Sequence, residues 1–299
     1  MNADAPARAD RVAVVIPAYR AAATVRGVVD AFAELVDLVI VVDDGSADGA
    51  AATLAGSPAV LLAHERNRGV GAATRTGIRE ALARGADIVV KVDADGQMDP
   101  AQLVNLIAPL QARAADVAKG NRWTHGRELA QMPPVRRCGN LVLGFLVRAA
   151  TGAWRIFDPT DGYVAWRAEV LELVDLDEAE DRFRFEISML RMLVAAGAVV
   201  RDVPMPARYG DAGSHLRPFH EAPGFAAYLT RALIGRVWRQ YFVHDFNAVS
   251  LFLVSGVPLL AFGVAFGAWH WAQSIATGVP ATAGTVLLAA LPTLLGVNL

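Results

Sequence analysis

Lysine and cysteine are almost missing from this chain of 299 residues. Lys91 and Lys119 are the only lysines, so arginine carries nearly all of the positive charge. The single cysteine, Cys138, excludes an internal disulfide and a zinc site built from cysteines. The histidines show no spacing typical of paired metal ligands. The formal net charge of −2 gives no indication of nucleic acid as a partner.

Charged side chains are absent from residues 246–299, which contain no Asp, Glu, Lys or Arg. Ala248–Trp271 is long enough to span a bilayer, which takes roughly 20 apolar residues, and Ala281–Leu299 is a second apolar segment. Arginines precede the first segment, so the positive-inside rule places the large domain in the cytosol. A buried hydrophobic hairpin in a soluble protein is the alternative. The second segment stops at the last residue without a polar flank, so either the chain is truncated or this helix ends unusually.

The N-terminus also lacks an apolar stretch, so it does not resemble a secretory signal. We therefore expect a multi-pass protein of the cytoplasmic (inner) membrane with its large domain facing the cytosol. The expected organisation is a polar tail (1–10), an α/β catalytic domain (11–220), an amphipathic interfacial helix (221–245) and two transmembrane helices (246–299). Arginines alternate with aromatic and aliphatic residues in the segment 221–245, which is typical of a helix lying at a membrane surface.

Strands and helices alternate along the first half of the chain. This alternation predicts a mainly parallel sheet with helices on both faces. The expected strands are Val12–Ile16, Leu38–Val42, Ala59–Ala63, Asp87–Val92, Asp116–Lys119, a strand ending near Trp166, and Val199–Val203. The expected helices of this domain are Thr24–Phe32, Gly71–Arg84, Pro100–Gln111, Val135–Ala149 and Phe183–Ala196.

Two acidic clusters directly follow buried strands of this predicted sheet. The first is Asp43-Asp44-Gly45-Ser46-Ala47-Asp48, and the second is Asp93-Ala94-Asp95-Gly96-Gln97. Ligands of open α/β sheets bind at the carboxyl ends of the strands. Asp93, Asp95 and Gln97 offer the oxygen ligands that Mg²⁺ or Mn²⁺ prefers, and such a cation can neutralise a diphosphate leaving group. The alternative is that Asp93 and Asp95 only cap the helix near Pro100.

The ordered motifs of this chain resemble glycosyltransferase family 2. They are Val14-Val15-Ile16-Pro17-Ala18-Tyr19, then DDGSADG, then Asn67-Arg68-Gly69-Val70-Gly71-Ala72, then DADGQMDP. The resemblance covers roughly residues 12–241 and implies the GT-A fold, which is Rossmann-like. Within the family the chain looks most like the polyprenyl- and dolichyl-phosphate sugar synthases, which implies a nucleotide sugar (GDP- or UDP-linked), a lipid phosphate acceptor and the membrane as partners. Whether the chain forms a homo-oligomer stays open.

The resemblance also implies roles for individual residues. Asp93, Asp95 and Gln97 would hold the metal and the donor diphosphate, and Arg122 would lie near the donor sugar. Arg208 and Ser214 would belong to a loop that closes over phosphate, a task that suits the planar fork of arginine. The catalytic set implied is Asp95, Arg122, Asp161 and Arg208. The donor-binding set implied is Pro17, Ala18, Tyr19, Asp43, Asp44, Asn67, Gly71, Asp93 and Ser214.

Three positions depart from the family pattern. Arg20-Ala21 stands where the family usually has Asn-Glu, which puts that part of the donor pocket in doubt. His215 replaces the usual lysine after the loop serine. Asp161 replaces the usual serine before Gly162. A carboxylate there can act as general base for a hydroxyl acceptor, position the acceptor, or simply form a turn; a phosphate acceptor is already ionised and needs no base.

These features together predict an inverting, metal-dependent transfer of a hexose, from GDP-mannose or UDP-glucose, to a polyprenyl phosphate at the cytosolic face of the membrane. Transfer to a glycan or protein hydroxyl, with Asp161 as base, is the enzymatic alternative. The alternative without catalysis is an inactive membrane-anchored scaffold that binds nucleotide sugars. A processive synthase is disfavoured because residues 237–240 do not match the expected Gln-x-x-Arg-Trp element.

Overall fold

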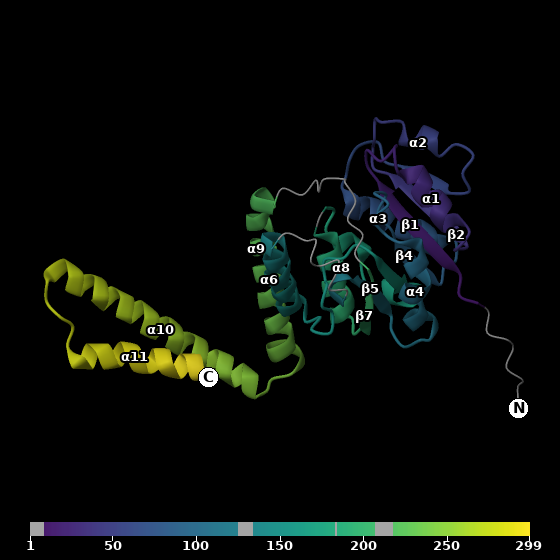
Figure 1. The fold of residues 1–299 in the computed structure, drawn as a ribbon. Helices are drawn as coiled ribbons and strands as arrows, with labels where there is room; N and C mark the ends of the chain where they lie inside the picture. Colours follow the sequence, from purple (N-terminus) through teal and green to yellow (C-terminus); the bar gives the residue numbers. More distant parts are fainter. Residues whose placement is uncertain (1–8, 125–133, 183, 207–217) are drawn as a thin grey trace, which may run out of the picture. The chain divides into compact units, whose positions relative to one another are not determined.

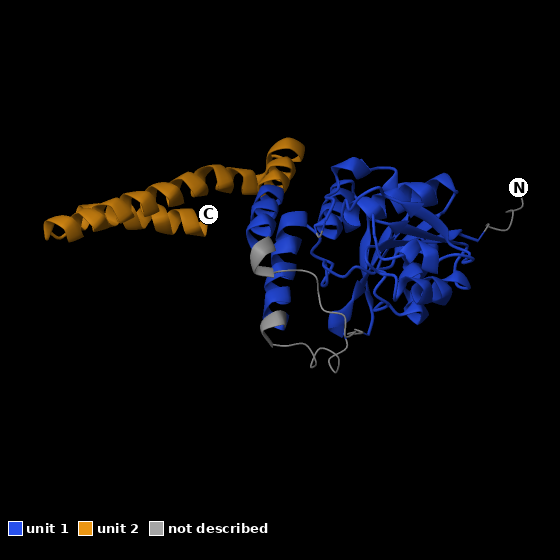
Figure 2. Cartoon of the chain, turned by 90° about the horizontal axis from the view of Figure 1, so that it is seen from above, with its two compact units in different colours: residues 1–233 blue, residues 234–299 orange. Residues whose placement is uncertain are grey.

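The computed structural model describes residues 9–124, 134–182, 184–206 and 218–299. The chain divides into two compact units, residues 1–233 and residues 234–299 (Figure 2). The first unit is built on a single seven-stranded sheet. The second consists of the end of one helix and two further helices. The domain boundaries expected from the sequence remain predictions.

The first unit is built around the sheet seen in Figure 1. Its strand order is β3-β2-β1-β4-β6-β5-β7. Strand β6 runs antiparallel to both of its neighbours, and every other pair is parallel. Val164 of β6 pairs with Lys91 of β4 on one side and with Lys119 of β5 on the other. The strands are β1 (Val12–Ala18), β2 (Leu38–Asp43), β3 (Val60–Ala63), β4 (Ile88–Lys91), β5 (Val117–Asn121), β6 (Val164–Arg167) and β7 (Val200–Pro204).

Helices cover both faces of this sheet (Figure 1). Successive side chains of a strand point to opposite faces, so Val14 of β1 packs into one core and Val15 into the other. Helices α1 and α4 cover the first core, and α3 and α8 cover the second. The helices of this unit are α1 (Val25–Ala33), α2 (Ala50–Thr53), α3 (Val70–Ala83), α4 (Leu103–Gln111), α6 (Pro134–Thr151), α7 (Ala168–Leu171), α8 (Phe185–Ala195) and α9 (Pro218–Trp238), with 3₁₀ turns η1 (Pro100–Gln102), η2 (Arg122–Thr124) and η3 (Leu176–Glu178).

The predicted fold class is confirmed: the protein is α/β, with a mostly parallel sheet between helices. The expected helix Pro100–Gln111 begins as the 3₁₀ turn η1 and continues as α4. Asp99 caps η1, since its Oδ1 accepts the N–H of Ala101 at 3.1 Å. This capping by Asp99 leaves Asp93 and Asp95 without that role.

The second unit contains two apolar helices, α10 (Ala248–Thr277) and α11 (Ala283–Asn298), after a π-helical turn, η4 (Arg239–His244). Asn247 caps α10 through the N–H of Val249, and Gly278 ends it in the left-handed conformation. The two helices pack antiparallel: a Cβ on Gly263 would lie 2.3 Å from Thr293 Oγ1. Within the described residues, α10 is the one helix long and apolar enough to cross a membrane, and α11 is apolar but shorter, with 16 residues.

Candidate active site

The loop after β2 is shaped by its own acidic side chains. Asp43 Oδ1 accepts the N–H of Ser46 at 2.9 Å. Gly45 has φ +71°, and a Cβ there would lie 2.5 Å from the carbonyl carbon of Arg66. A glycine is therefore required where this loop crosses the chain that follows β3. The first of the two predicted acidic clusters therefore forms a turn at the carboxyl end of β2, and the Asp43 side chain holds this turn in place.

Asp44 is buried, with 2% of its surface exposed, and it organises the next loop. Its Oδ2 accepts the N–H of Gly69 at 2.7 Å, and its Oδ1 accepts the N–H of Arg68 at 2.9 Å. Oδ1 also lies 2.7 Å from His64 Nδ1. The predicted donor-binding residue Asp44 therefore holds the loop that carries Asn67, another predicted donor-binding residue.

Of the three predicted donor-binding residues Pro17, Ala18 and Tyr19, Tyr19 is the exposed one, whereas Pro17 and Ala18 are buried in β1. The Arg20 guanidinium lies 5.3 Å from the centre of the Tyr19 ring. Arg20 has φ +54°, a conformation uncommon for residues other than glycine, and its N–H donates to Ser46 Oγ at 2.9 Å. Arg20, which departs from the family pattern, thus places its guanidinium cation against the exposed ring of Tyr19.

The second acidic cluster follows β4. The Oδ1 of Asp95 accepts the N–H of Gln97 at 3.0 Å, across a turn formed by Gly96 with φ +75°. Partial burial, together with the charge of Asp93, raises the pKa of the Asp95 carboxyl. Asp93 and Asp95 therefore lie close enough for their negative charges to repel each other. A cation bound by both carboxylates would relieve this repulsion.

Lys91 is a residue of this site that the sequence reasoning missed. It is buried, and its Nζ lies 2.5 Å from Asp93 Oδ1 and 3.0 Å from Glu186 Oε1 of α8. Burial alone would lower the pKa of its ammonium, but the charges of Asp93 and Glu186 outweigh burial and raise that pKa. A lysine in a continuous apolar strand, two residues before the Asp, was the sequence signal for this contact.

The donor set of the cluster fits a divalent cation. Asp93 gives one carboxylate oxygen to Lys91 and retains the other, and the carboxylate of Asp95 and the amide of Gln97 add oxygen ligands of the kind that Mg²⁺ and Mn²⁺ take. A Cβ on Gly162 would lie 2.6 Å from Asp93 Oδ2, so the absence of a side chain keeps that oxygen uncrowded. Among the described residues no three His, Cys, Asp or Glu side chains form a metal cluster. Mg²⁺ in nucleotide sites commonly keeps water and phosphate oxygens as further ligands.

The segment that contains Asp161 folds around Arg122. Arg122 Nε lies 2.8 Å from Asp158 Oδ2, and its second nitrogen lies 3.1 Å from Oδ1, so the pair is bidentate. Arg122 Nε also lies 3.4 Å from Asp161 Oδ2. Lys119, fully buried in β5, donates to the carbonyl of Asp161. The predicted catalytic residues Arg122 and Asp161 are therefore neighbours.

The pKa values of the two acids diverge. Burial raises the pKa of Asp161, and the charge of Asp158 adds to this rise. Burial acts on Asp158 in the same direction, but the bidentate Arg122 outweighs it and lowers the pKa of Asp158. Asp161 Oδ1 accepts the N–H of Tyr163 at 2.9 Å, which is the turn contact that the sequence analysis gave as one alternative.

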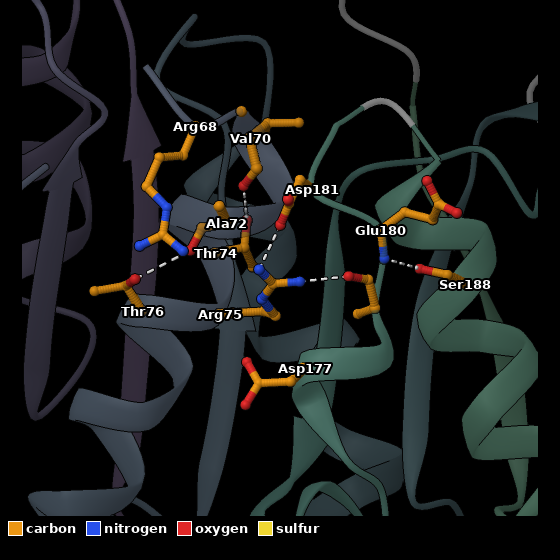
Figure 3. A network of polar contacts seen from close by, with 12 residues as sticks. Arg68, Val70, Ala72, Thr74, Arg75, Thr76, Asp177, Glu180, Asp181 and Ser188 are labelled. Atoms are coloured by element: carbon orange, nitrogen blue, oxygen red, sulfur yellow. Dashed lines mark hydrogen bonds and ion pairs between the residues drawn. The ribbon is translucent and has the colours of Figure 1, made fainter. Parts of the chain in front are cut away.

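A polar network joins α3 to the segment before α8 (Figure 3). The guanidinium of Arg75 donates to the carbonyl of Ala179 and to Oδ1 of Asp181. The N–H of Gly71 donates to the carbonyl of Asp181 at 2.8 Å. Gly71, predicted to bind the donor, therefore packs directly against this segment. The network fixes the segment leading into Glu186 relative to the loop held by Asp44.

Two predicted site residues, Arg208 and Ser214, lie outside the described residues, and so does His215. The remaining predicted residues gather at the carboxyl ends of β1, β2 and β4 or on the chain beside them. Lys91, Lys119, Arg75 and Asp158 complete the site and were not predicted.

The sheet order, the acidic loop after β4 and the buried Asp44 define a GT-A fold, the fold of nucleotide-sugar-dependent glycosyltransferases. The model of the family described as glycosyl transferase family 2 matches residues 13–174. The chain belongs to this family and is a glycosyltransferase.

Two relatives of this chain are named for polyprenyl-phosphate sugar transfer. The undecaprenyl-phosphate mannosyltransferase of Micrococcus luteus is 34% identical over 173 residues, which cover 56% of this chain and 70% of that protein. The polyprenol monophosphomannose synthase of Mycolicibacterium smegmatis is 34% identical, covering 56% of this chain and 65% of the relative. The predicted resemblance to polyprenyl-phosphate sugar synthases is thereby confirmed.

The fold is also that of a solved structure. Glucosyl-3-phosphoglycerate synthase from Mycobacterium tuberculosis, in complex with Mn²⁺, UDP and glucosyl-3-phosphoglycerate, superposes with a TM-score of 0.54 at 24% identity. The match covers 76% of this chain and 80% of the other. At this identity the likeness shows the fold alone.

Proposed function

We propose that the chain transfers a hexose from a nucleotide sugar to a polyprenyl phosphate, with inversion at the anomeric carbon. The observation that carries this proposal is the pair Asp93 and Asp95 at the end of β4, next to the segment that holds Arg122. The names of the relatives favour mannose as the sugar. A GDP-linked donor is our first choice, and UDP-linked hexoses are the second.

Asp93, Asp95 and Gln97 would hold Mg²⁺ or Mn²⁺, which would neutralise charge on the departing diphosphate. Asp44 keeps the loop 67–69 in place, and Tyr19 offers an exposed aromatic face for the base. Arg122 provides a fixed positive charge beside the donor sugar. The acceptor phosphate oxygen forms the new bond to the anomeric carbon while the bond to the diphosphate breaks, and the nucleoside diphosphate leaves. Positioning and charge neutralisation supply the catalysis.

A lipid acceptor also fits the surface of the first unit. Helix α6 exposes a run of large apolar side chains, with Phe145 54% exposed and Trp154, just after the helix, 53% exposed. The two rings pack edge to face, with centroids 5.9 Å apart. An exposed apolar patch of this kind marks a surface for membrane or partner contact. Helix α10 would anchor the chain, and by the positive-inside rule the arginines of α9 favour the cytosolic side for the catalytic unit.

Asp161 is better suited to positioning than to base catalysis. Its carboxylate is 8% exposed and already contacts Arg122 and the N–H of Tyr163. Because a phosphate acceptor needs no base, these contacts agree with a lipid phosphate. Transfer to a hydroxyl, with Asp161 as base, is the outcome that the experiment must exclude.

The test is donor screening on membranes that contain the full chain. Radiolabelled GDP-mannose, UDP-glucose and UDP-GlcNAc are each offered with polyprenyl phosphate, with and without Mn²⁺ or Mg²⁺. We expect metal-dependent label in the lipid fraction from one donor. Asp95→Asn should abolish it, whereas Asp30→Asn, which alters an exposed ion pair with Arg26, should not.

A folded protein that labels no lipid with any donor would overturn the lipid-phosphate proposal. Label in a glycan or protein fraction would favour a hydroxyl acceptor. Absence of both transfer and metal-dependent donor hydrolysis would favour the inactive scaffold.

A further inference from the structure

The two lysines of the chain lie in one row of the sheet. Lys91 of β4 and Lys119 of β5 both pair with Val164 of the strand between them. Residues that pair across neighbouring strands share a face, so both ammonium groups lie on the same side of the sheet. Both side chains are buried, with 1% and 2% of the residue surface exposed. They are therefore internal charges that cannot reach a substrate.

Their contacts differ in kind. The ammonium of Lys91 lies between two carboxylates, Asp93 at 2.5 Å and Glu186 at 3.0 Å. The ammonium of Lys119 instead donates to the neutral carbonyl of Asp161. Lys91 therefore acts directly on a side chain of the predicted metal site, whereas Lys119 fixes the segment behind Arg122.

Glu186 shares the charge of Lys91 with Asp93. Its side chain is 14% exposed, and it stands at the first turn of α8. The segment before α8 is tied to α3 by Arg75 and by the N–H of Gly71, so the position of Glu186 is fixed. Without Glu186, the whole charge of Lys91 would act on Asp93.

We propose that Lys91 and Glu186 are positioning residues that set the affinity of the Asp93–Asp95 site for its divalent cation. Lys91 holds one oxygen of Asp93 and weakens the negative field at the site. Glu186 offsets part of that weakening. The inference rests on the metal site of the proposed function and adds to it two residues that do not touch the cation.

This role makes predictions of opposite sign for the two residues. Lys91→Met removes a positive charge and should tighten cation binding, whereas Glu186→Gln removes a negative charge and should loosen it. Charges a few ångströms apart in a partly buried site interact strongly enough that each change should be on the order of tenfold. The double variant Lys91→Met/Glu186→Gln removes one charge of each sign and should return close to the wild-type affinity.

The test is direct Mn²⁺ binding to the full chain in detergent micelles, measured by the loss of the free Mn²⁺ electron paramagnetic resonance signal, with and without GDP or UDP. Arg167→Met is the matched control, because Arg167 is a buried cation of the same sheet, 3% exposed, that pairs with Ile88 at the opposite end of β4 from Asp93. It should change the Mn²⁺ dissociation constant by less than about twofold. Thermal unfolding of each variant confirms that the protein binding Mn²⁺ is folded.

Weaker binding in all three variants, including the double one, would overturn the charge-setting role and leave a purely structural one. Tightening by Arg167→Met equal to that by Lys91→Met would also overturn it. If wild-type protein binds no Mn²⁺ even with nucleotide, both the metal site and this inference fail. If Mn²⁺ binding follows the expected signs while no lipid is labelled, the lipid-phosphate proposal alone fails.

Discussion

Arg122 and Asp158 face each other as a bidentate ion pair, with nitrogen–oxygen distances of 2.8 and 3.1 Å. Asp158 is 1% exposed, so its charge depends on this partner. Arg122→Met should therefore destabilise the protein by roughly 3–5 kcal/mol, the usual result of leaving a buried carboxylate unpaired. It should also abolish transfer.

Thermal and denaturant unfolding of the full chain would measure this effect. The double variant Arg122→Met/Asp158→Asn should recover much of the stability but not the transfer. Recovery of transfer as well would show that Arg122 acts only through Asp158 and does not contact the donor.

Asp161→Asn distinguishes positioning from base catalysis. An asparagine oxygen can still accept the N–H of Tyr163, so with a lipid phosphate acceptor we expect kcat to fall by about tenfold or less. A general base contributes roughly 10²–10⁴-fold. A loss in that range, in a variant with wild-type unfolding temperature, would contradict the phosphate mechanism.

Asp44→Asn should weaken donor binding through the loop 67–69. Each carboxylate oxygen of Asp44 accepts one backbone N–H, from Arg68 or from Gly69. In the asparagine variant the side-chain NH₂ would replace one of these oxygens and would face a backbone N–H that it cannot accept. We expect a stability loss of about 1–3 kcal/mol and a higher KM for the nucleotide sugar. Asp37→Asn alters a similar contact, to the N–H of Val12 at 2.8 Å, at the amino end of β1 and so at the end of the strand away from the site. It should lower stability while leaving that KM unchanged; an equal rise in KM would point to a general loss of folding.

Gly71→Ala should disrupt the contact between α3 and the segment before α8. The added Cβ would lie 2.2 Å from the carbonyl oxygen of Glu180 and 2.9 Å from Phe185 Cβ. The carbonyl of Glu180 can move away from this Cβ only if the backbone shifts. We therefore expect a loss of about 2 kcal/mol or more in the free energy of unfolding. Gly27→Ala is the control: nothing lies within 4 Å of its Cβ, and alanine in a helix should add about 0.5–1 kcal/mol. Equal unfolding midpoints for the two variants would refute the packing argument.

Asp202 predicts a pH dependence of stability. Burial raises the pKa of its carboxyl to about 6, and among the described residues its Oδ1 is buried without a hydrogen-bond partner. Because the folded pKa lies above the ordinary value of 3.8, the folded protein binds more protons between these values. Stability therefore falls as pH rises from about 4 to about 6, by roughly 1–2 kcal/mol once solvent screening of the partly exposed carboxyl is included.

Asp202→Asn keeps an oxygen for the N–H of Phe157, which Asp202 accepts at 2.6 Å, and has no proton to lose. The variant should be more stable than wild type at neutral pH, and the difference should shrink toward pH 4. Unfolding midpoints measured across this range would test it. A difference independent of pH would show that Asp202 does not titrate in this window.

The acidic clusters of the site could be predicted because their residues are consecutive in the sequence. DDGS and DADGQ follow apolar runs that can only be strands of a covered sheet, and the parallel order brings the ends of those strands together. The charge-free stretch after residue 245 likewise indicated an apolar region by composition alone. Strand and helix positions agree with the prediction to within a few residues because the apolar periodicity is strong in this half of the chain.

Local patterns along the chain are therefore sufficient to predict the fold class, the family motifs and the acidic clusters. Other features depend on the assembled sheet: the reversal of β6, the pairing of Lys91 with Asp93 and Glu186, and the enclosure of Arg122 by Asp158 and Asp161. Lys91 and Glu186 are 95 positions apart by number (186 − 91), and no local pattern links them. Such contacts depend on which strands become neighbours and on which faces their side chains share, so they arise only when the sheet is assembled.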